Sequence, residues 1–216
     1  MKILKTILAL FISFTVTAQA VQDITYFDIP TDQVGEFIQT HKKFMDVTMN
    51  DERKVQGQWV YRHFYGSGAS VAVFTDFANI NDAVNDDPWA SLRSKWQSSN
   101  EDERKELEAL GQKYASFLVN HSDDIRSSNF ENNFVGKENV DWDIPFILVV
   151  GNYNVNKPNA SIAGNAFMEW RTKPGVEKGL QLGGGYTTHF SGSGPDLQLF
   201  SGFKNIVDFA KSISTE

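Results

Sequence analysis

Apolar residues along this chain recur with two different periods, and the order of these periods predicts the order of the structural elements. Short apolar runs at 24–29 and 146–150 indicate strands, and the second, which does not alternate, is expected to be buried on both faces. Each run is followed by a segment with helical spacing. The apolar face of the first helix comprises Val34, Phe37, Ile38, His41, Met45 and Thr48, and that of the second comprises Ile162, Ala166 and Trp170.

Two alternating runs follow each helical segment, and the loops GSGA and GSGP that join them have the length expected for a β-hairpin. Each hairpin leads to an asparagine, Asn79 or Asn205, that can cap a second helix. The order strand, helix, hairpin, helix is the ferredoxin-like pattern, and it occurs twice. A fourth strand is expected at 129–135 in the first copy, and no counterpart is expected in the second.

The two copies also share sequence. Residues 63–84, HFYGSGASVAVFTDFANINDAV, match residues 189–210, HFSGSGPDLQLFSGFKNIVDFA, at 10 of 22 positions with a constant offset of 126. Similarity at a fixed offset indicates a unit that was built twice. We therefore predict an α+β protein of two tandem ferredoxin-like repeats, at 21–135 and 144–216, which form a pseudo-dimeric α/β barrel.

The first copy is longer than the second because residues 85–127 form an enlarged helical section. Asn100 and Glu103 are spaced as a capping box at the start of a helix. Apolar side chains from Leu107 to Ile125 then recur at helical spacing. Residues 136–143 are expected to link the two halves.

The N-terminus predicts export. Lys2 and Lys5 precede an apolar stretch of about ten residues, and the small-residue pattern Ala18-Gln19-Ala20 follows it. This is the layout of a signal peptide at 1–20, and the apolar stretch is too short for a membrane anchor, the alternative interpretation. We expect an exported protein, periplasmic or secreted, with no stable membrane insertion after cleavage.

Composition narrows the classes of function. After cleavage, the chain would have 18 basic and 27 acidic residues, and this net charge of −9 disfavours a nucleic-acid partner. Because the chain has no cysteine, thiolate catalysis, thiolate metal sites and haem attachment through cysteine are excluded. No spacing of histidine and carboxylate residues predicts a metal site.

Two segments resemble the dimeric α/β-barrel superfamily, which includes antibiotic-biosynthesis-monooxygenase-like and NIPSNAP-like proteins. Each segment, at 71–82 and 197–208, has a strand, two phenylalanines and an Asn-Ile-x-Asp helix start. The resemblance implies two ferredoxin-like sheets that close around a cavity. It also allows a cofactor-independent monooxygenase, or a haem-handling protein that uses one histidine as iron ligand.

Alternation assigns side chains to the two faces of each hairpin, if His63 lies opposite Ala72. An apolar face, with Val60, Phe64, Val71 and Val73 and with Tyr186, Phe190, Leu197 and Leu199, should lie under the helices. The other face should line the cavity, where mixed aromatic and polar side chains are typical of a small-molecule site. The predicted site comprises His63 and His189 as catalytic residues, with Trp59, Tyr61, Phe74, Thr187, Gln198 and Phe200 as ligand-binding residues.

Two interpretations of the histidines remain open. His63 and His189 either bind a ligand or transfer its proton, since imidazole titrates near neutral pH, or they only hydrogen-bond a loop at the end of each hairpin. His41, on the apolar face of its helix, is expected to be a core histidine with its hydrogen bonds satisfied.

We expect the protein to bind a small, partly hydrophobic molecule without a cofactor. The monooxygenase-like or haem-handling enzyme is the alternative, and a protein-association module without a ligand is the third possibility. A homo-oligomer is compatible with each of these.

Overall fold

The computed structural model describes residues 19–128, 130–136 and 140–214, so the predicted signal peptide at 1–20 lies almost entirely outside the described residues. Within these ranges, no helix is both long and apolar enough to cross a membrane. The elements in chain order are β1 (Val21–Phe27), α1 (Val34–Thr48), β2 (Val55–Arg62), β3 (Val71–Phe77), α2 (Ile80–Val84), α3 (Pro88–Ser98), α4 (Glu101–Phe117), a 3-10 helix (Leu118–Asn120), β4 (His121–Ser127), a second 3-10 helix (Phe130–Asn132), β5 (Asn133–Val135), β6 (Ile147–Tyr153), α5 (Lys157–Phe167), a π-helix (Met168–Thr172), α6 (Lys173–Glu177), β7 (Gly183–Gly192), β8 (Leu197–Phe203) and α7 (Ile206–Ser214).

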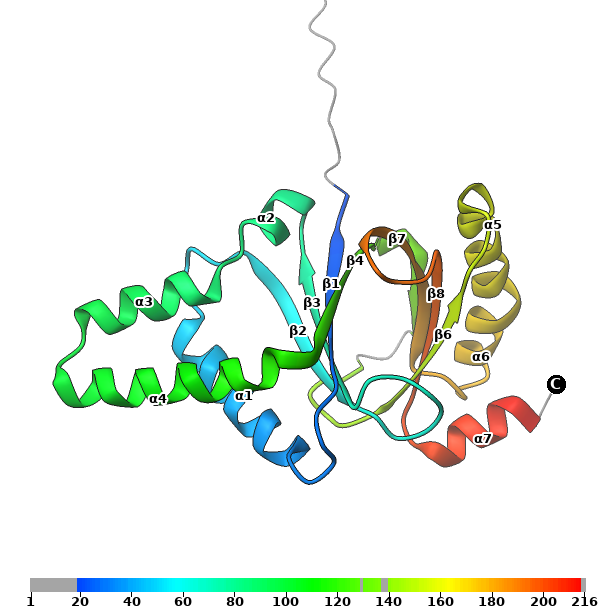
Figure 1. Cartoon of the computed structure of the whole chain (residues 1–216). Coiled ribbons are helices and arrows are strands. Elements are labelled where there is room, and N and C mark those ends of the chain that lie inside the picture. Colours follow the sequence, from blue (N-terminus) through cyan, green and yellow to red (C-terminus); the bar gives the residue numbers. More distant parts are fainter. Residues whose placement is uncertain (1–18, 129, 137–139, 215–216) are drawn as a thin grey trace, which may run out of the picture.

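The strands form one curled antiparallel sheet in the order β2-β3-β1-β4-β7-β8-β6, and β5 pairs with the first part of β7. Figure 1 shows the helices of the first half on one side of the strands and those of the second half on the other. The order β2-β3-β1-β4 with helices between the strands is ferredoxin-like, which confirms the predicted α+β class.

Strand registers in the two halves differ by a constant number of residues. Ile24 of β1 pairs with Phe74 of β3, and 126 positions later Val150 of β6 pairs with Phe200 of β8. Likewise, Tyr61 pairs with Ala72, and Thr187 pairs with Gln198. The offset is the one found between the two similar segments of the sequence.

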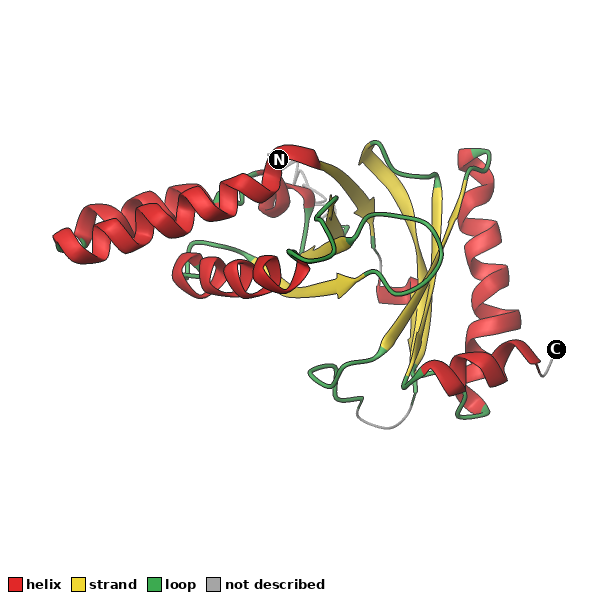
Figure 2. Ribbon diagram, turned by 60° about the horizontal axis from the view of Figure 1, so that its bottom comes forward, coloured by secondary structure: helices red, strands yellow, loops and turns green. Residues whose placement is uncertain are grey.

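Each half buries one face of its strands against its own helices. In the first half, Phe27, Val71 and Val73 pack with α1 and α4, and Phe44 stacks on Tyr114 with ring centroids 4.1 Å apart. In the second half, Tyr186 and Leu197 pack against α5 and the π-helix. Figure 2 shows the contrast between the long arm formed by α3 and α4 and the single helical layer of the second half.

Helix starts follow the predicted capping chemistry. The Asn79 side chain accepts a hydrogen bond from the backbone N–H of Asp82, and Asn205 does the same for Asp208. Asn100 and Glu103 form a complete capping box at the start of α4.

The enlarged helical section is shorter than predicted. It ends at Asn120, and residues 121–127, which were expected to continue the helix, form the fourth strand of the first half. The expected strand at 129–135 shrinks to β5. Asp124 and Arg126 alternate with Ile125 in β4, and the strand conformation lets their charged side chains share one face while the strand pairs on both edges.

The buried face of α5 is opposite to the predicted one. Ile162 of α5 and Trp170 of the π-helix that follows it point to solvent, with 68% and 86% of their surface exposed, whereas Ala160 and Gly164 of α5 face the sheet. A Cβ on Gly164 would lie 2.4 Å from the ring of Tyr186, so the small residue lets helix and sheet approach closely. Packing against Tyr186 therefore overrides the apolar pattern.

Gly164→Ala tests this close approach. We expect a loss of about 1–2 kcal/mol of unfolding free energy, because overpacking costs about 1–3 kcal/mol and the helix-propensity gain offsets part of it. Gly35→Ala in α1 is the matched control, since nothing lies within 4 Å of its Cβ, and it should not destabilise the protein. Urea unfolding measures the stability of both variants. A Gly164→Ala protein as stable as the native one would contradict the close approach of helix and sheet at this position.

Strand β6 is an edge strand, not a strand buried on both faces. β8 pairs with only one edge of β6, and the side chains of Val150, Asn152 and Tyr153 are exposed. Strand β7 begins with three glycines, at 183–185, because a side chain there would collide with the neighbouring strand: a Cβ on Gly184 would lie 2.5 Å from the Phe200 carbonyl oxygen.

Candidate functional site

The candidate site lies on the face of the sheet that points away from the helices, which we call the inner face. Register places Trp59, Tyr61 and Phe74 on it in the first half, and Thr187 and Gln198 in the second. The predicted register is wrong by two residues, since Tyr61 and not His63 lies opposite Ala72. A shift of two preserves the face of every side chain, so the predicted division into faces still holds within the strands.

The register shift does change the ends of the hairpins. Phe64 and Phe190 were expected under the helices but are exposed to 66% and 48%. Phe64 lies beyond the end of β2, and Phe190 lies in the last part of β7, past its last pair with β8. Only the predicted apolar residues inside the strands, such as Val71 and Leu197, reach the cores.

Three charged or titratable side chains are joined on the inner face between the two halves. Arg126 of β4 donates from Nη1 to Asp124 Oδ2 at 2.6 Å, and Asp124 Oδ1 lies 3.0 Å from Nδ1 of His189 on β7. Arg126 and Asp124 are fully buried, and the His189 side chain is 16% exposed. The carboxylate therefore bridges a guanidinium and an imidazole, and we call these three residues the β4–β7 cluster.

Further contacts fix the arginine of the β4–β7 cluster. Its Nε donates to Thr187 Oγ1 at 2.6 Å, Nη2 donates to the Thr187 carbonyl, and Nη1 also donates to the Pro195 carbonyl. Gly194 leaves room for Asp124, because a Cβ there would collide with its carboxylate. A guanidinium with four such bonds is held rigidly and offsets the buried negative charge.

The predicted residue Gln198 joins the halves at a second place. Its Nε2 donates to Tyr26 Oη at 3.2 Å and to Asn152 Oδ1 at 3.0 Å. Burial raises the pKa of Tyr26, and the nearby Asp124 adds to the rise, so the phenol stays neutral and can donate its own proton. Polar groups from β1, β6 and β8 thus converge beside the β4–β7 cluster.

An aromatic group occupies the first-half part of the inner face. Tyr61 contacts Phe74 edge-to-face at 5.0 Å and Phe146 at 5.8 Å between ring centroids. The Trp59 ring packs against Gly57, where a Cβ would be 2.6 Å from it. Burial raises the pKa of Tyr61 strongly, which keeps its phenol neutral.

The structure separates the two predicted histidines. His63 follows the end of β2 and is exposed, and none of the described residues gives its side chain a hydrogen bond or an ion pair. His189 is largely buried and bonded to Asp124. Phe200 is half-buried, on the inner face beside Gly185. A catalytic role for His63 stays a prediction, and no contact joins it to His189 within the described ranges.

Asp124 and Arg126 were missed by sequence reasoning. Their signal is the alternation Asp-x-Arg in HSDDIRS, which places an acidic and a basic side chain on the same face of a strand. The longer apolar pattern of the preceding helix masked it.

A second polar network lies under the helices of the first half. His41 bonds Tyr114 Oη through Nδ1 at 3.1 Å and Gln58 Oε1 through Nε2 at 3.0 Å, and Gln58 donates to Thr75. Burial lowers the pKa of His41, so the ring is neutral and its bonds are satisfied, as expected for a core histidine.

Asp23 lies across from Thr75 in the same row and differs from its neighbours. Its Oδ1 is buried and finds no hydrogen-bond partner among the described residues. Burial, assisted by the charges of Asp123, Asp124 and Asp86, raises the pKa of Asp23 to about 6.

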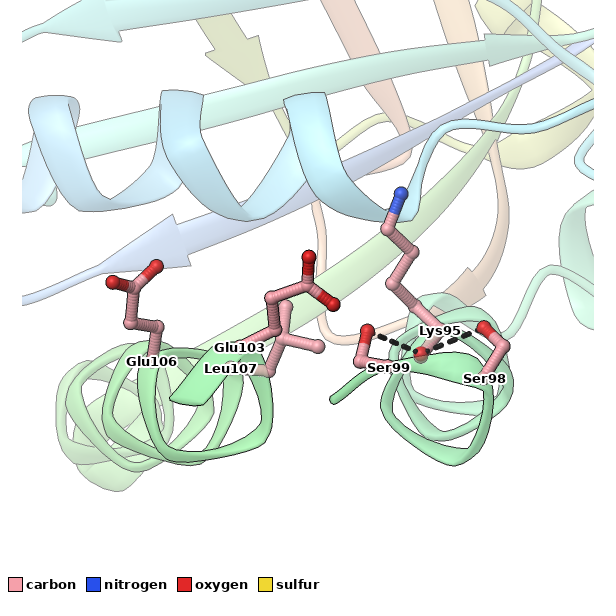
Figure 3. A pocket seen from close by; sticks show the side chains of 6 residues that line it. All are labelled: Lys95, Ser98, Ser99, Glu103, Glu106 and Leu107. Atoms are coloured by element: carbon pink, nitrogen blue, oxygen red, sulfur yellow. Dashed lines mark hydrogen bonds between the residues drawn. The ribbon is translucent and has the colours of Figure 1, made fainter. Parts of the chain in front are cut away.

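Two surface grooves lie among the helices, away from the inner face. One, of about 380 Å³, runs between α3 and α4, and Figure 3 shows Lys95 and Ser99 on one side of it and Glu103 and Glu106 on the other. The second, of about 500 Å³, lies between α1 and α4. None of the predicted site residues lines either groove. No group of three or more metal-binding side chains occurs in the part of the chain that the structure describes.

Solved structures with the same arrangement cover both halves of this chain. They include proteins named "putative monooxygenase" from Lactobacillus acidophilus NCFM (TM-score 0.55, 9% identity, 90% of this chain and 81% of that chain) and from Fusobacterium nucleatum subsp. nucleatum ATCC 25586 (TM-score 0.57, 12% identity, 91% and 81%). A third is named an anthrone oxidase-like protein (TM-score 0.55, 9% identity, 89% and 76%).

Neither a protein-family model nor a curated protein sequence matches this chain. The structural likeness at these low identities concerns the backbone and not the site. The chain therefore shares the ferredoxin-like α+β fold of these monooxygenase-like proteins.

Proposed function

We propose that the inner face binds a small, partly hydrophobic molecule between the aromatic group and the β4–β7 cluster. The supporting observation is that apolar rings and convergent polar groups share one face at the meeting place of the two halves. Trp59, Tyr61 and Phe74 would contact the apolar part of the ligand. Thr187, Gln198 and His189 would contact its polar part, and Phe200 would add an apolar contact from the second half.

The bond to Asp124 prepares His189 for proton transfer. With its Nδ1–H donating to the carboxylate, the imidazole keeps Nε2 as the acceptor, and this nitrogen has no partner among the described residues. Such a histidine can take a proton from an O–H or an activated C–H of a bound molecule, and Asp124 then stabilises the imidazolium.

This geometry favours a second candidate, a cofactor-independent monooxygenase-like enzyme. His189 would remove a proton from a methylene beside a carbonyl, and the carbanion would react with dioxygen to give a new carbonyl and one water. The names of the fold neighbours support this class of reaction, but only as an analogy of fold.

Haem handling is the remaining variant of the proposal. One residue fits it, because the Nε2 of His189 would be available to hold the iron while Asp124 orients the ring through Nδ1. Bound haem would supply redox chemistry at its iron. A Soret band in the purified protein tests this variant.

The proposal is tested by the binding of uncharged aromatic ketones and phenols, with calorimetry for affinity and an oxygen electrode for turnover. Anthrone, suggested by the name of one neighbour, is the first probe. We expect Trp59→Ala to weaken binding about tenfold, since an aromatic contact contributes about 0.5–1.5 kcal/mol beyond area burial.

His189→Gln separates binding from catalysis. If the protein is an enzyme, oxygen consumption should fall about 100-fold or more while affinity changes little, because glutamine still offers the ligand a polar group but cannot take its proton. His121→Gln, an exposed histidine bonded to the Leu118 carbonyl, is the matched control and should leave both quantities unchanged. Binding unaffected by Trp59→Ala would contradict the proposed site.

The proposal includes two statements about the origin of the chain. We infer that the halves at 21–135 and 144–216 are tandem repeats forming a pseudo-dimeric barrel, which the constant register offset of 126 supports. Export with cleavage after Ala20 would leave β1 intact, because that strand begins at Val21. N-terminal sequencing of the exported protein tests this cleavage site.

A further inference from the structure

The sheet has two edge strands, β2 and β6, and they run in the same direction. The outer edges of β2 and β6 pair with no strand in the described ranges. All neighbouring strands are antiparallel, and there are six steps from β2 to β6, so these two strands are parallel to each other. One extended segment antiparallel to both could hydrogen-bond to both edges.

The other junction between the halves already contains such a segment. There β4 lies between β1 and β7 and is antiparallel to each. By the register offset of 126, β6 corresponds to β1, and β2 corresponds to β7. The pair β2 and β6 is therefore equivalent to the two strands that hold β4.

A ring contact joins β2 to the residue that directly precedes β6, at the corresponding place. Tyr61 touches Phe146, with ring centroids 5.8 Å apart. Their counterparts at the other junction, Thr187 and Ala20, both bond to the segment between them, through Arg126 and through the backbone of Ser128. Strands separated by one further strand lie about 10 Å apart, a distance that two facing aromatic rings can bridge.

The chemistry of the two junctions differs at one side chain. His189 is bonded to Asp124, which β4 supplies, whereas its counterpart His63 is exposed and has no such partner in the described structure. Arg62, beside it, is exposed as well. This end of the β2–β6 gap is thus basic and offers an imidazole without a carboxylate.

Side chains along the gap indicate which kind of residue an incoming segment must carry there. Leu148 and Val150 of β6 share the inner face with Tyr61, and Val150 is 36% exposed. An incoming strand would place alternate side chains against them.

We propose that the gap between β2 and β6 binds an extended segment of a partner polypeptide by β-strand addition. The segment lies antiparallel to both edges, presents a carboxylate to His63 as Asp124 does to His189, and presents an apolar side chain to Leu148. Both backbone edges of the segment must be free, because one edge would pair with β2 and the other with β6. A strand in the sheet of a second copy does not meet this condition, since at least one of its edges is already paired.

The probe is a blocked nine-residue peptide with the sequence of residues 120–128, in which Arg126→Leu supplies the apolar side chain. The control peptide also carries Asp124→Asn. Hydrogen exchange of the full chain is measured with 1 mM peptide. We expect exchange to slow at least tenfold in both 55–62 and 147–153, with α5 unchanged, because strand addition protects edge amides.

Two comparisons decide the outcome. The native protein should bind the control peptide roughly tenfold more weakly than the first peptide, which is the effect of losing one charge-assisted hydrogen bond. The His63→Ala protein should bind the first peptide more weakly by the same factor. His121→Ala should bind as the native protein does. The proposal is overturned if neither strand is protected, if only one of them is, or if the two peptides bind equally well.

Discussion

Replacing Arg126 by leucine is expected to lower the free energy of unfolding by about 3–5 kcal/mol, the usual cost of leaving one member of a buried ion pair alone. Asp124 would keep a single bond, to His189, in a place where water does not reach its carboxylate. Thr187 and the Pro195 carbonyl would each lose a donor as well. Urea unfolding monitored by tryptophan fluorescence measures the change.

Arg93→Leu is the matched control. Arg93 also bonds an aspartate, Asp87 at 3.2 Å, but both side chains are at least half exposed, so the loss should stay within about 0.5 kcal/mol. A loss below about 1 kcal/mol for Arg126→Leu would mean that the β4–β7 cluster is hydrated, and the proposed site would have to be abandoned with it.

Asp23→Asn is expected to stabilise the protein at neutral pH and to change little in acid. The folded protein holds the Asp23 proton up to about pH 6, whereas the unfolded chain releases it near 3.8, so rising pH removes stability between these values. The roughly two pKa units correspond to about 2–3 kcal/mol, which the neutral amide recovers above pH 7.

The measurement compares the unfolding free energy of the native and variant proteins at pH 4 and at pH 7.5. Because only differences are used, other titrating groups, such as Asp76 with its raised pKa, cancel. Asp46→Asn, an exposed aspartate paired with Lys42, should show no such pH dependence. An Asp23→Asn gain that is equal at both pH values would contradict the assignment to a buried carboxyl.

Strand faces could be predicted from the sequence more reliably than strand registers. Alternation fixes which side chains share a face, so Trp59 and Tyr61 were assigned together although the register was wrong by two residues. The ends of the hairpins depend on the loop, which is longer than the four residues assumed. Phe64 and Phe190 were therefore misplaced, and His63 was expected to share a cavity with His189.

Strand β4 and the buried face of α5 could not be predicted from the local pattern. Ile125 continues the helical spacing of α4, and only pairing with β1 and β7 makes the segment a strand. On α5, Gly164 is chosen by its contact with Tyr186, a residue 22 positions away, while Ile162 and Trp170 mimic a core face. In both cases a tertiary contact determines the local structure, and the periodicity of the sequence carries no information about that contact.

Because the two junctions differ, similar local sequences have different chemical surroundings. The segments that begin His-Phe at 63 and 189 are alike, yet one imidazole rests against a buried carboxylate and the other meets water. That difference comes from a strand far away in the chain, not from the segments themselves. The surroundings of each imidazole therefore depend on the strand packed beside it, and a change in that strand alone would alter them without any change in the His-Phe segments.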